Sequence, residues 1–146
     1  MITLAVDPGR CTGFALFSVS DLTWCCAEAP ETALSYLKGS SAIDRIVIEI
    51  PQVYRLEHSK GDPGDLIELA FCAGMVVGRI RPTTLQKVLP REWKGQLPKR
   101  VTEHRARAVL TASEMARVPK VSKGLAHNLW DAIALGLWSL GRLKLT

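Results

Sequence analysis

Residues 45–54, RIVIEIPQVY, are the segment from which the fold can be predicted most directly. Its first half is almost continuously apolar and has no alternating polar face, which is typical of a strand covered on both sides in a parallel sheet. Glu49 lies near the end of this predicted strand. A carboxylate in that position is costly unless an Arg or Lys, a shifted pKa or a metal ion compensates for its charge.

The segments before this strand predict the antiparallel part of a sheet. Residues 2–8, 12–19 and 22–29 are apolar and are joined by short turns. Strands so closely connected run antiparallel, because a parallel pair needs a long crossover. A helix is predicted at 31–38, and the strand at 45–50 that follows it can therefore lie parallel to one of the first three strands.

The rest of the chain predicts more helices and one more strand. We expect a helix at 65–80, a fifth strand at 82–89, a basic loop at 90–99 and helices at 100–115 and 124–143. This order predicts an α/β fold in which a five-stranded mixed sheet carries helices on both faces. The last helix is apolar almost all round, so we expect it to pack against the sheet.

The length and composition suit a single domain, residues 1–146. A chain of 146 residues can bury one core but is too short for two. Its apolar runs are short or interrupted by charge, and its first residues lack the basic start of a signal peptide, so we expect a cytoplasmic protein with no membrane span. The four cysteines have no CxxC spacing, so neither a zinc site nor a disulfide framework is expected.

The charge is distributed unevenly along the chain. Residues 1–73 contain 5 Lys or Arg and 10 Asp or Glu, whereas residues 74–146 contain 14 and 4. Clustered cations favour a polyanion partner, because they displace counterions from a phosphate backbone. A solvated basic face without a partner explains the charge alone equally well.

Three carboxylates interrupt otherwise apolar elements: Asp7 and Glu49 at strand ends, and Asp131 inside the last helix. Each alone has an ordinary explanation as a turn residue, an ion-pair partner or part of a polar stripe. Together they can converge, because the two strands can be neighbours and the last helix must cover the sheet. Oxygen ligands select Mg²⁺ or Mn²⁺, and a pair of such ions activates a water for phosphodiester hydrolysis.

Two polar residues share a helix face with Asp131. Asn128 lies three residues before it and His127 four. Either can be a further metal ligand or a proton carrier, and either can instead be a cap or a satisfied polar group of the core.

Three motifs together resemble a known family. LAVDPGRCTGFALF, IVIEIPQVY and HNLWDAIALGLW are similar, in order and spacing, to the motifs of RuvC-type Holliday junction resolvases of the RNase H-like superfamily, in the phage-type branch. The segments between them, GDPGDLIELAFCAG and VLPREWKGQLPK, extend the resemblance over nearly the whole chain.

The resemblance implies a homodimer in a bacterial or phage-infected cell that serves DNA recombination and repair. It would introduce paired nicks across a four-way DNA junction with two Mg²⁺ or Mn²⁺ ions, and without a covalent enzyme intermediate. By position, Asp7, Glu49 and Asp131 match the family's metal ligands. Relatives often carry an Asp or His where this chain has Asn128, so the fourth ligand stays open between Asn128 and His127.

The resemblance also suggests DNA contacts. Tyr54 matches an aromatic residue that wedges into the junction, or else it packs under its loop. Trp93 and Lys94 lie where a relative's Trp-Lys pair contacts the junction or supports the loop, although packing of the Trp93 indole into the core is slightly favoured. The dimer surface is expected on apolar helix, including parts of residues 65–79. The candidates for phosphate contacts are Lys87, Arg91, Lys94, Lys99, Arg100, Arg105 and Arg107.

Three other functions use the same features. A YqgF-like RNA-processing nuclease needs the same carboxylates. The segment DPGRCTG also resembles the first phosphate-binding hairpin of sugar kinases and actin-like ATPases, although those proteins close two such domains around a nucleotide. A junction-binding protein that has lost catalysis is the third alternative.

Overall fold

The computed structural model describes residues 1–38, 42–52 and 62–145. Within them, one sheet contains five strands in the order β3-β2-β1-β4-β5. The first three strands form an antiparallel meander, and β4 and β5 continue the sheet parallel to β1. The predicted mixed sheet is therefore confirmed. The strands are β1 (Ile2–Asp7), β2 (Thr12–Ser18), β3 (Asp21–Glu28), β4 (Arg45–Glu49) and β5 (Thr84–Val88).

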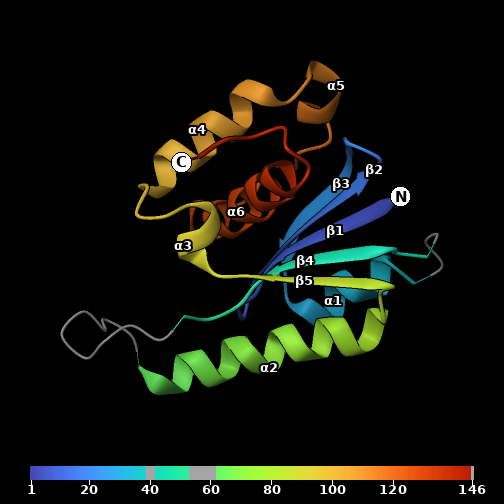
Figure 1. Ribbon diagram of the computed structural model, residues 1–146, viewed down its shortest axis with the longest axis vertical. Helices are drawn as coiled ribbons and strands as arrows, with labels where there is room; N and C mark the ends of the chain where they lie inside the picture. The colour runs from blue at the N-terminus through green and yellow to red at the C-terminus, as the bar shows by residue number, and fades with distance from the viewer. Residues whose placement is uncertain (39–41, 53–61, 146) are drawn as a thin grey trace.

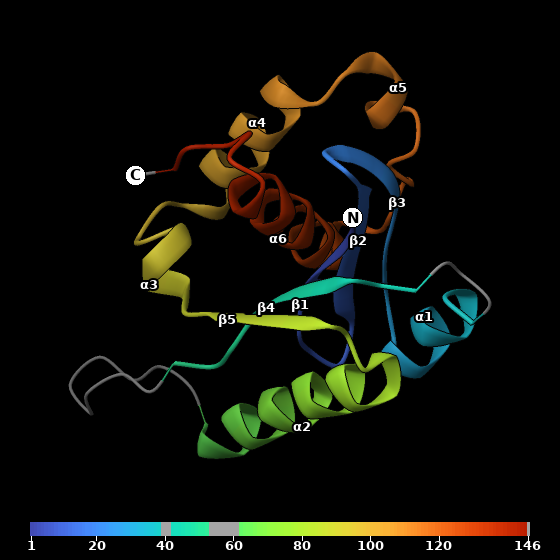
Figure 2. The ribbon, with the colours of Figure 1, turned by 45° about the vertical axis from the view of Figure 1, so that its right-hand side comes forward.

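Helices cover both faces of this sheet (Figure 1). The helices are α1 (Pro30–Tyr36), α2 (Pro63–Ile80), α3 (Pro90–Trp93), α4 (Lys99–Val109), α5 (Ala112–Met115) and α6 (Lys123–Ser139). Helices α1 and α2 lie on one face, while α6 lies on the other with α3, α4 and α5 around it (Figure 2). No helix among the described residues is long and apolar enough to cross a membrane.

Burial on both faces explains the continuous apolar run in β4. Val47 belongs to the core cluster on the α6 side, whereas Ile46 and Ile48 belong to the cluster on the α1 and α2 side. Because successive side chains of a strand point to opposite faces, a strand covered on both faces has no position left for a polar residue. Between Arg45, where it begins, and Glu49, where it ends, the strand is thus entirely apolar.

A close approach places α6 against β2. A Cβ atom at Gly13 would overlap the backbone carbonyl of Asn128, and one at Gly136 would overlap the ring of Phe17. The two glycines therefore allow the helix backbone and the strand to come closer than larger residues permit. This contact confirms that the last helix packs on the sheet, and it fixes the height of the α6 side chains above β1 and β2.

The structure corrects the predicted helix at 100–115, which is two helices. The chain leaves helical geometry at Leu110, and Thr111 then begins α5 by accepting a hydrogen bond from the backbone N–H of Glu114. Glu114 accepts in return from the backbone N–H of Thr111. This capping box starts a new helix even though apolar residues continue at helical spacing.

Two other boundaries also differ from expectation. The last helix ends at Ser139, before Gly141, which has a φ of 74° in the left-handed region. The basic loop predicted at 90–99 contains the single helical turn α3, which begins with Pro90 in the first position. This turn matters for the site because it places Trp93 and Lys94.

Candidate active site

The first two carboxylates lie at one edge of the sheet. Strands β1 and β4 are parallel neighbours whose last paired residues are Val6 and Ile48. Asp7 and Glu49 each follow by one position, so they end adjacent strands side by side. In α/β sheets the carboxyl ends of parallel strands form the usual place for a functional site.

The third carboxylate reaches the same edge from the helix layer. Asp131 is buried, with 5% of its surface exposed, on the part of α6 that packs on the sheet. One atom shows that Asp131 and Glu49 are close: the Lys94 ammonium lies 2.9 Å from Asp131 Oδ2 and 3.0 Å from Glu49 Oε2. The strand end and the helix therefore share one cation.

Lys94 is the centre of this arrangement. It follows α3, which begins after β5 and lies beside α6 (Figure 1). Its side chain is only 19% exposed and also lies over the Trp93 ring, 4.8 Å from the centroid. Desolvation lowers the pKa of Lys94, but the attraction of Glu49 and Asp131 outweighs it and raises the pKa overall. Lys94 is therefore charged at neutral pH, and its single positive charge is shared between two carboxylates.

Trp93 fixes the second contact to Glu49. Its side chain is fully buried, as expected from the sequence, and its indole Nε1 donates a hydrogen bond of 2.7 Å to Glu49 Oε2. A tryptophan that packs into the core and donates one hydrogen bond holds its partner in a single orientation. This bond was not predicted from the sequence, because Trp93 and Glu49 are 44 residues apart in the chain.

Asp7 is in a different electrostatic situation. Among the described residues, the ion pairs of the centre join Lys94 to Glu49 and Asp131, and none involves Asp7. Burial raises the pKa of Asp7 well above its ordinary value, and the negative charges of Glu49 and Asp131 raise it further. The free energy of the centre would therefore fall if another cation were present.

The donor set suits a divalent ion, although the side chains are arranged around lysine. Asp7, Glu49 and Asp131 offer only oxygen ligands, which Mg²⁺ and Mn²⁺ prefer. As placed, no three His, Cys, Asp or Glu side chains of the described residues are gathered closely enough to hold one ion. The chemistry thus fits a metal centre, and in this structure Lys94 supplies the positive charge.

The polar residues before Asp131 serve different purposes. The Asn128 amide donates a hydrogen bond to the backbone carbonyl of Cys11, which ties α6 to the turn between β1 and β2. Burial lowers the pKa of His127, and the charge of Lys99 lowers it further against the opposing attraction of Asp131. The neutral imidazole is therefore favoured, and it can accept a proton.

The predicted phosphate-binding residues separate into two groups. Lys94 lies inside the acidic centre, Arg105 donates to the carbonyl of Leu145, and Arg107 pairs with Glu103 while its guanidinium lies 4.1 Å from the centroid of the Trp130 ring. The remaining candidates are exposed on β5, α3 and the start of α4; they are Lys87, Arg91, Lys99 and Arg100. Tyr54, the predicted junction wedge, lies outside the described residues.

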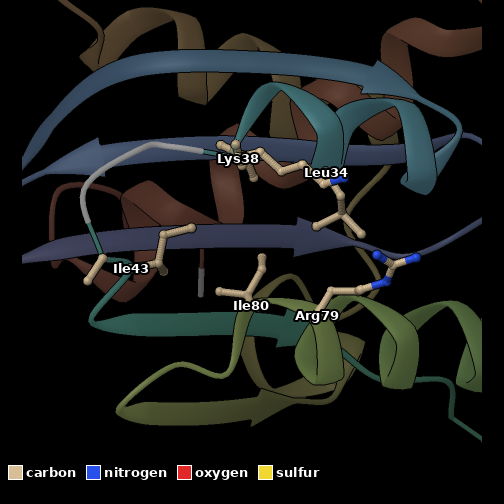
Figure 3. Close-up of a pocket in the computed structure, with 7 residues that line it drawn as sticks. Leu34, Lys38, Ile43, Arg79 and Ile80 are labelled. Carbon is tan, nitrogen blue, oxygen red and sulfur yellow. The ribbon is translucent and has the colours of Figure 1, made fainter.

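A pocket of about 230 Å³ lies at the other end of the parallel strands (Figure 3). It is lined by Leu34, Leu37, Lys38, Ala42, Ile43, Arg79 and Ile80. Because Ile43 precedes β4 and Glu49 ends it, the pocket and the carboxylates occupy opposite ends of that strand. The pocket is therefore separate from the acidic centre.

Comparisons with known proteins support the fold. No protein-family model matches the sequence, and no curated protein does. Two solved structures match over 99% of both chains at 15% sequence identity: Thermus thermophilus RuvC, with a TM-score of 0.62, and T. thermophilus RuvC in complex with Holliday junction substrate, with a TM-score of 0.65. Over nearly its whole length, this chain therefore has the RuvC-type, RNase H-like α/β fold that its motifs led us to expect.

Proposed function

We propose that this protein is a metal-dependent, structure-selective DNA endonuclease that resolves four-way junctions by paired nicks. The observation that carries the proposal is the shared cation: acids from β4 and α6 hold one ammonium at the carboxyl edge of a RuvC-type sheet. The structural neighbours add support at the level of the fold, since one of them is a RuvC in complex with Holliday junction substrate.

Asp7, Glu49 and Asp131 would hold the metal, which we propose to be two Mg²⁺ or Mn²⁺ ions per site. Such ions polarise the phosphodiester, activate a water and stabilise the leaving oxygen. Asp7 gains most from their charge, because burial and two neighbouring acids disfavour its ionised form. Whether Asn128 or His127 adds a ligand stays a prediction; the neutral His127 imidazole can also take up a proton.

The exposed cations around the centre would hold the DNA backbone. Arg91 on α3 and Lys99 and Arg100 at the start of α4 flank the Lys94 segment in the chain and are exposed. Cations in such positions bind phosphates without reading sequence, so they favour shape over base identity. This arrangement suits a nuclease that selects a branched structure.

Helix α2 would supply the homodimer surface. Ile67 and Phe71 are 72% and 69% exposed, and they lie on one stripe of the helix with Gly74 and Gly78. Two large apolar side chains exposed one turn apart on the same helix mark a candidate interaction surface, and the glycines beside them would allow a second helix to approach closely. A two-fold dimer would present two active sites to the near two-fold symmetry of a junction.

The dimer surface can be tested with Phe71→Ser. We expect its sedimentation or light-scattering mass to change from dimer to monomer at micromolar concentration, while Tyr36→Ser, on the exposed face of α1, leaves the mass unchanged. A dimer that survives Phe71→Ser would place the interface elsewhere.

The experiment that tests the function compares the wild type with Asp7→Asn on a labelled four-way junction in Mg²⁺. We expect the variant to lose cutting and to keep or improve junction binding, because a negative charge beside the DNA is removed. Linear duplex and structured RNA serve as controls. Preferred cutting of structured RNA would instead support a YqgF-like RNA-processing nuclease, and equal cutting by both proteins would refute the metal site.

The Lys94 contacts favour one second candidate, a junction-binding protein without catalysis. A site that no longer binds metal would still need a positive charge beside its acids, and Lys94 contacts two of the three. This candidate predicts tight junction binding and no divalent-dependent nicking, so the same assay separates it from the endonuclease.

A further inference from the structure

We infer that Lys94 takes the place of a divalent cation in the metal-free protein, so that metal ions and the Lys94 ammonium are alternative occupants of the acidic centre. The inference deepens the proposed function and rests on it. Before metal binds, the Lys94 side chain would supply the positive charge that Glu49 and Asp131 need.

The contacts of Lys94 support this substitution. Its Nζ lies 3.0 Å from Glu49 Oε2 and 2.9 Å from Asp131 Oδ2, and both oxygens belong to acids that would hold the metal. The lysine, like a metal ion, joins the end of β4 to α6. No other side chain of the described residues contacts both acids with a positive charge.

Joint occupancy of these oxygens is unfavourable. Mg²⁺ binds carboxylate oxygens at about 2.1 Å, well inside the distance at which the ammonium now lies from the same atoms. An ammonium and a divalent ion on the same two oxygens would repel each other strongly in a site with little solvent. A metal ion must therefore displace Lys94, or bind with one acid fewer.

The chain around Lys94 allows the side chain to move alone. Trp93 is fully buried and hydrogen-bonds Glu49, so the preceding residue is anchored. Gly95 and Gln96, which follow, are exposed, and a Cβ atom at Gly95 would meet nothing within 4 Å. The ammonium can thus leave the acids by rotation of its own four-carbon side chain, while Glu49 keeps its indole contact.

The substitution explains how the acids are tolerated without metal. Three carboxylates from β1, β4 and α6 would repel one another at this edge, and the Lys94 ammonium offsets part of that repulsion through its contacts with Glu49 and Asp131. Asp7, which has no such partner among the described residues, has a raised pKa instead. Lys94 therefore lowers the cost of holding Glu49 and Asp131 together without metal, and the affinity for metal is reduced by the free energy needed to remove the lysine.

The test is Mn²⁺ binding by isothermal titration calorimetry without DNA, on the wild type, Lys94→Met and Lys99→Met. Methionine keeps the length of the lysine side chain but cannot occupy the cation position. We expect Lys94→Met to bind Mn²⁺ at least about tenfold tighter than the wild type, and Lys99→Met to change affinity by no more than about threefold. Lys99 is the matched control because its charge acts on Asp7 and His127 without contacting the acids.

Two results would overturn the inference. Equal Mn²⁺ affinity of Lys94→Met and the wild type would show that the lysine does not compete, and an equal gain in Lys99→Met would show that only long-range charge matters. The same titration also separates the inference from the proposed function. If the wild type cuts junctions with Mg²⁺ but binds Mn²⁺ as tightly as Lys94→Met does, the inference is wrong and the proposed function stands. If Lys94→Met binds Mn²⁺ more tightly but the wild type does not cut, the proposed function is wrong and the inference stands. If none of the proteins binds Mn²⁺, both are wrong.

A second measurement uses the wild type and does not depend on whether the variant folds. Acetylation by a lysine-reactive ester, followed by mass spectrometry, reports the accessibility of each ammonium. We expect the acetylation rate of Lys94 to rise severalfold on addition of Mg²⁺, relative to exposed Lys120, and to stay unchanged in Asp7→Asn. A Lys94 rate that Mg²⁺ does not change in the wild type contradicts displacement.

Discussion

Two buried carboxylate centres in this molecule are built in opposite ways. Glu114 accepts from the backbone N–H groups of Leu22 and Thr111 and from both terminal nitrogens of Arg142, at 2.6 to 2.8 Å. Both of its carboxylate oxygens accept hydrogen bonds, and its negative charge is paired with the Arg142 guanidinium. Glu114 thereby joins α5, the start of β3 and the segment after α6. At the other centre, one ammonium contacts two of three acids: Lys94 pairs with Glu49 and Asp131, and Asp7 has no ion pair among the described residues.

The two centres are suited to different roles, because only one of them has its negative charge fully compensated. A fully satisfied carboxylate is a structural joint, because any change of partner loses free energy. An acidic centre with too little positive charge has free energy to gain from a further cation, so it is suited to binding one. The centres should therefore respond oppositely to mutation: the Glu114 centre in stability, the Asp7 centre in activity.

The largest effect should come from Asp131→Asn. Loss of the buried carboxylate that we propose as a metal ligand should reduce junction cutting by about 10³-fold or more. The free energy of unfolding in EDTA should change by no more than about 1 kcal/mol, because the lost Lys94 contact is offset by weaker repulsion at Asp7. Single-turnover cleavage and urea unfolding measure the two quantities. A variant that unfolds while the remaining folded fraction cuts normally would make this centre structural.

Glu114→Gln should show the reverse pattern. The substitution leaves Arg142 without its charged partner, and we expect the free energy of unfolding to fall by about 3 kcal/mol. Cutting per folded molecule should stay at the wild-type rate. Glu103→Gln is the matched control, since Glu103 pairs with Arg107 on the surface of α4 and should contribute less than about 1 kcal/mol. Similar losses of unfolding free energy in both variants would show that Glu114 stabilises the protein no more than a surface ion pair does.

Sequence reasoning found one of these centres and missed the other. Asp7, Glu49 and Asp131 were visible because each interrupts an apolar element whose strand or helix character is clear from periodicity. Glu114 was not, although Thr111 three residues before it is a capping signal that predicts the break between α4 and α5. Lys94 was recognised as a candidate for phosphate contacts and as part of a Trp-Lys pair, but its contact with the acids was not predicted, because nothing local distinguishes a lysine that turns inward from one that faces solvent.

The pH dependence of stability gives a third contrast. The hydrogen bonds from Arg142 lower the pKa of Glu114 from its ordinary value of 4.5 to about 2. Because an acid whose folded pKa is depressed stabilises above its unfolded pKa, this contribution is complete above about pH 4.5 and is lost as the pH falls toward about 2. The stability difference between the wild type and Glu114→Gln should therefore shrink by about 2 kcal/mol from pH 7 to pH 3.

Asp7 has the opposite sign in the same titration. Its folded pKa is raised by burial and by Glu49 and Asp131, so the protonated form is the stabilising one. In EDTA, that contribution is present below the ordinary pKa of 3.8 and is lost as the pH rises through the raised folded pKa. Urea unfolding across this range should show that, as the pH rises, the free energy of unfolding of Asp7→Asn increases relative to that of the wild type. A constant difference would contradict the burial of an ionisable Asp7.

The smallest effect that we expect comes from Trp93→Phe, which separates the contribution of the Trp93 hydrogen bond from that of Lys94 in the acidic centre. Phenylalanine keeps most of the buried ring but removes the N–H that orients Glu49, and groups that orient a metal ligand in this way typically contribute about 10-fold or more to metal affinity. Trp138→Phe, at the edge of the same core cluster, removes similar bulk without touching an acid of the centre. Mn²⁺ titration of the two variants should show about tenfold weaker binding for Trp93→Phe alone. Loss of stability in both variants with unchanged Mn²⁺ affinity would mean that Trp93 only fills the core, and the orientation of Glu49 would then depend on Lys94.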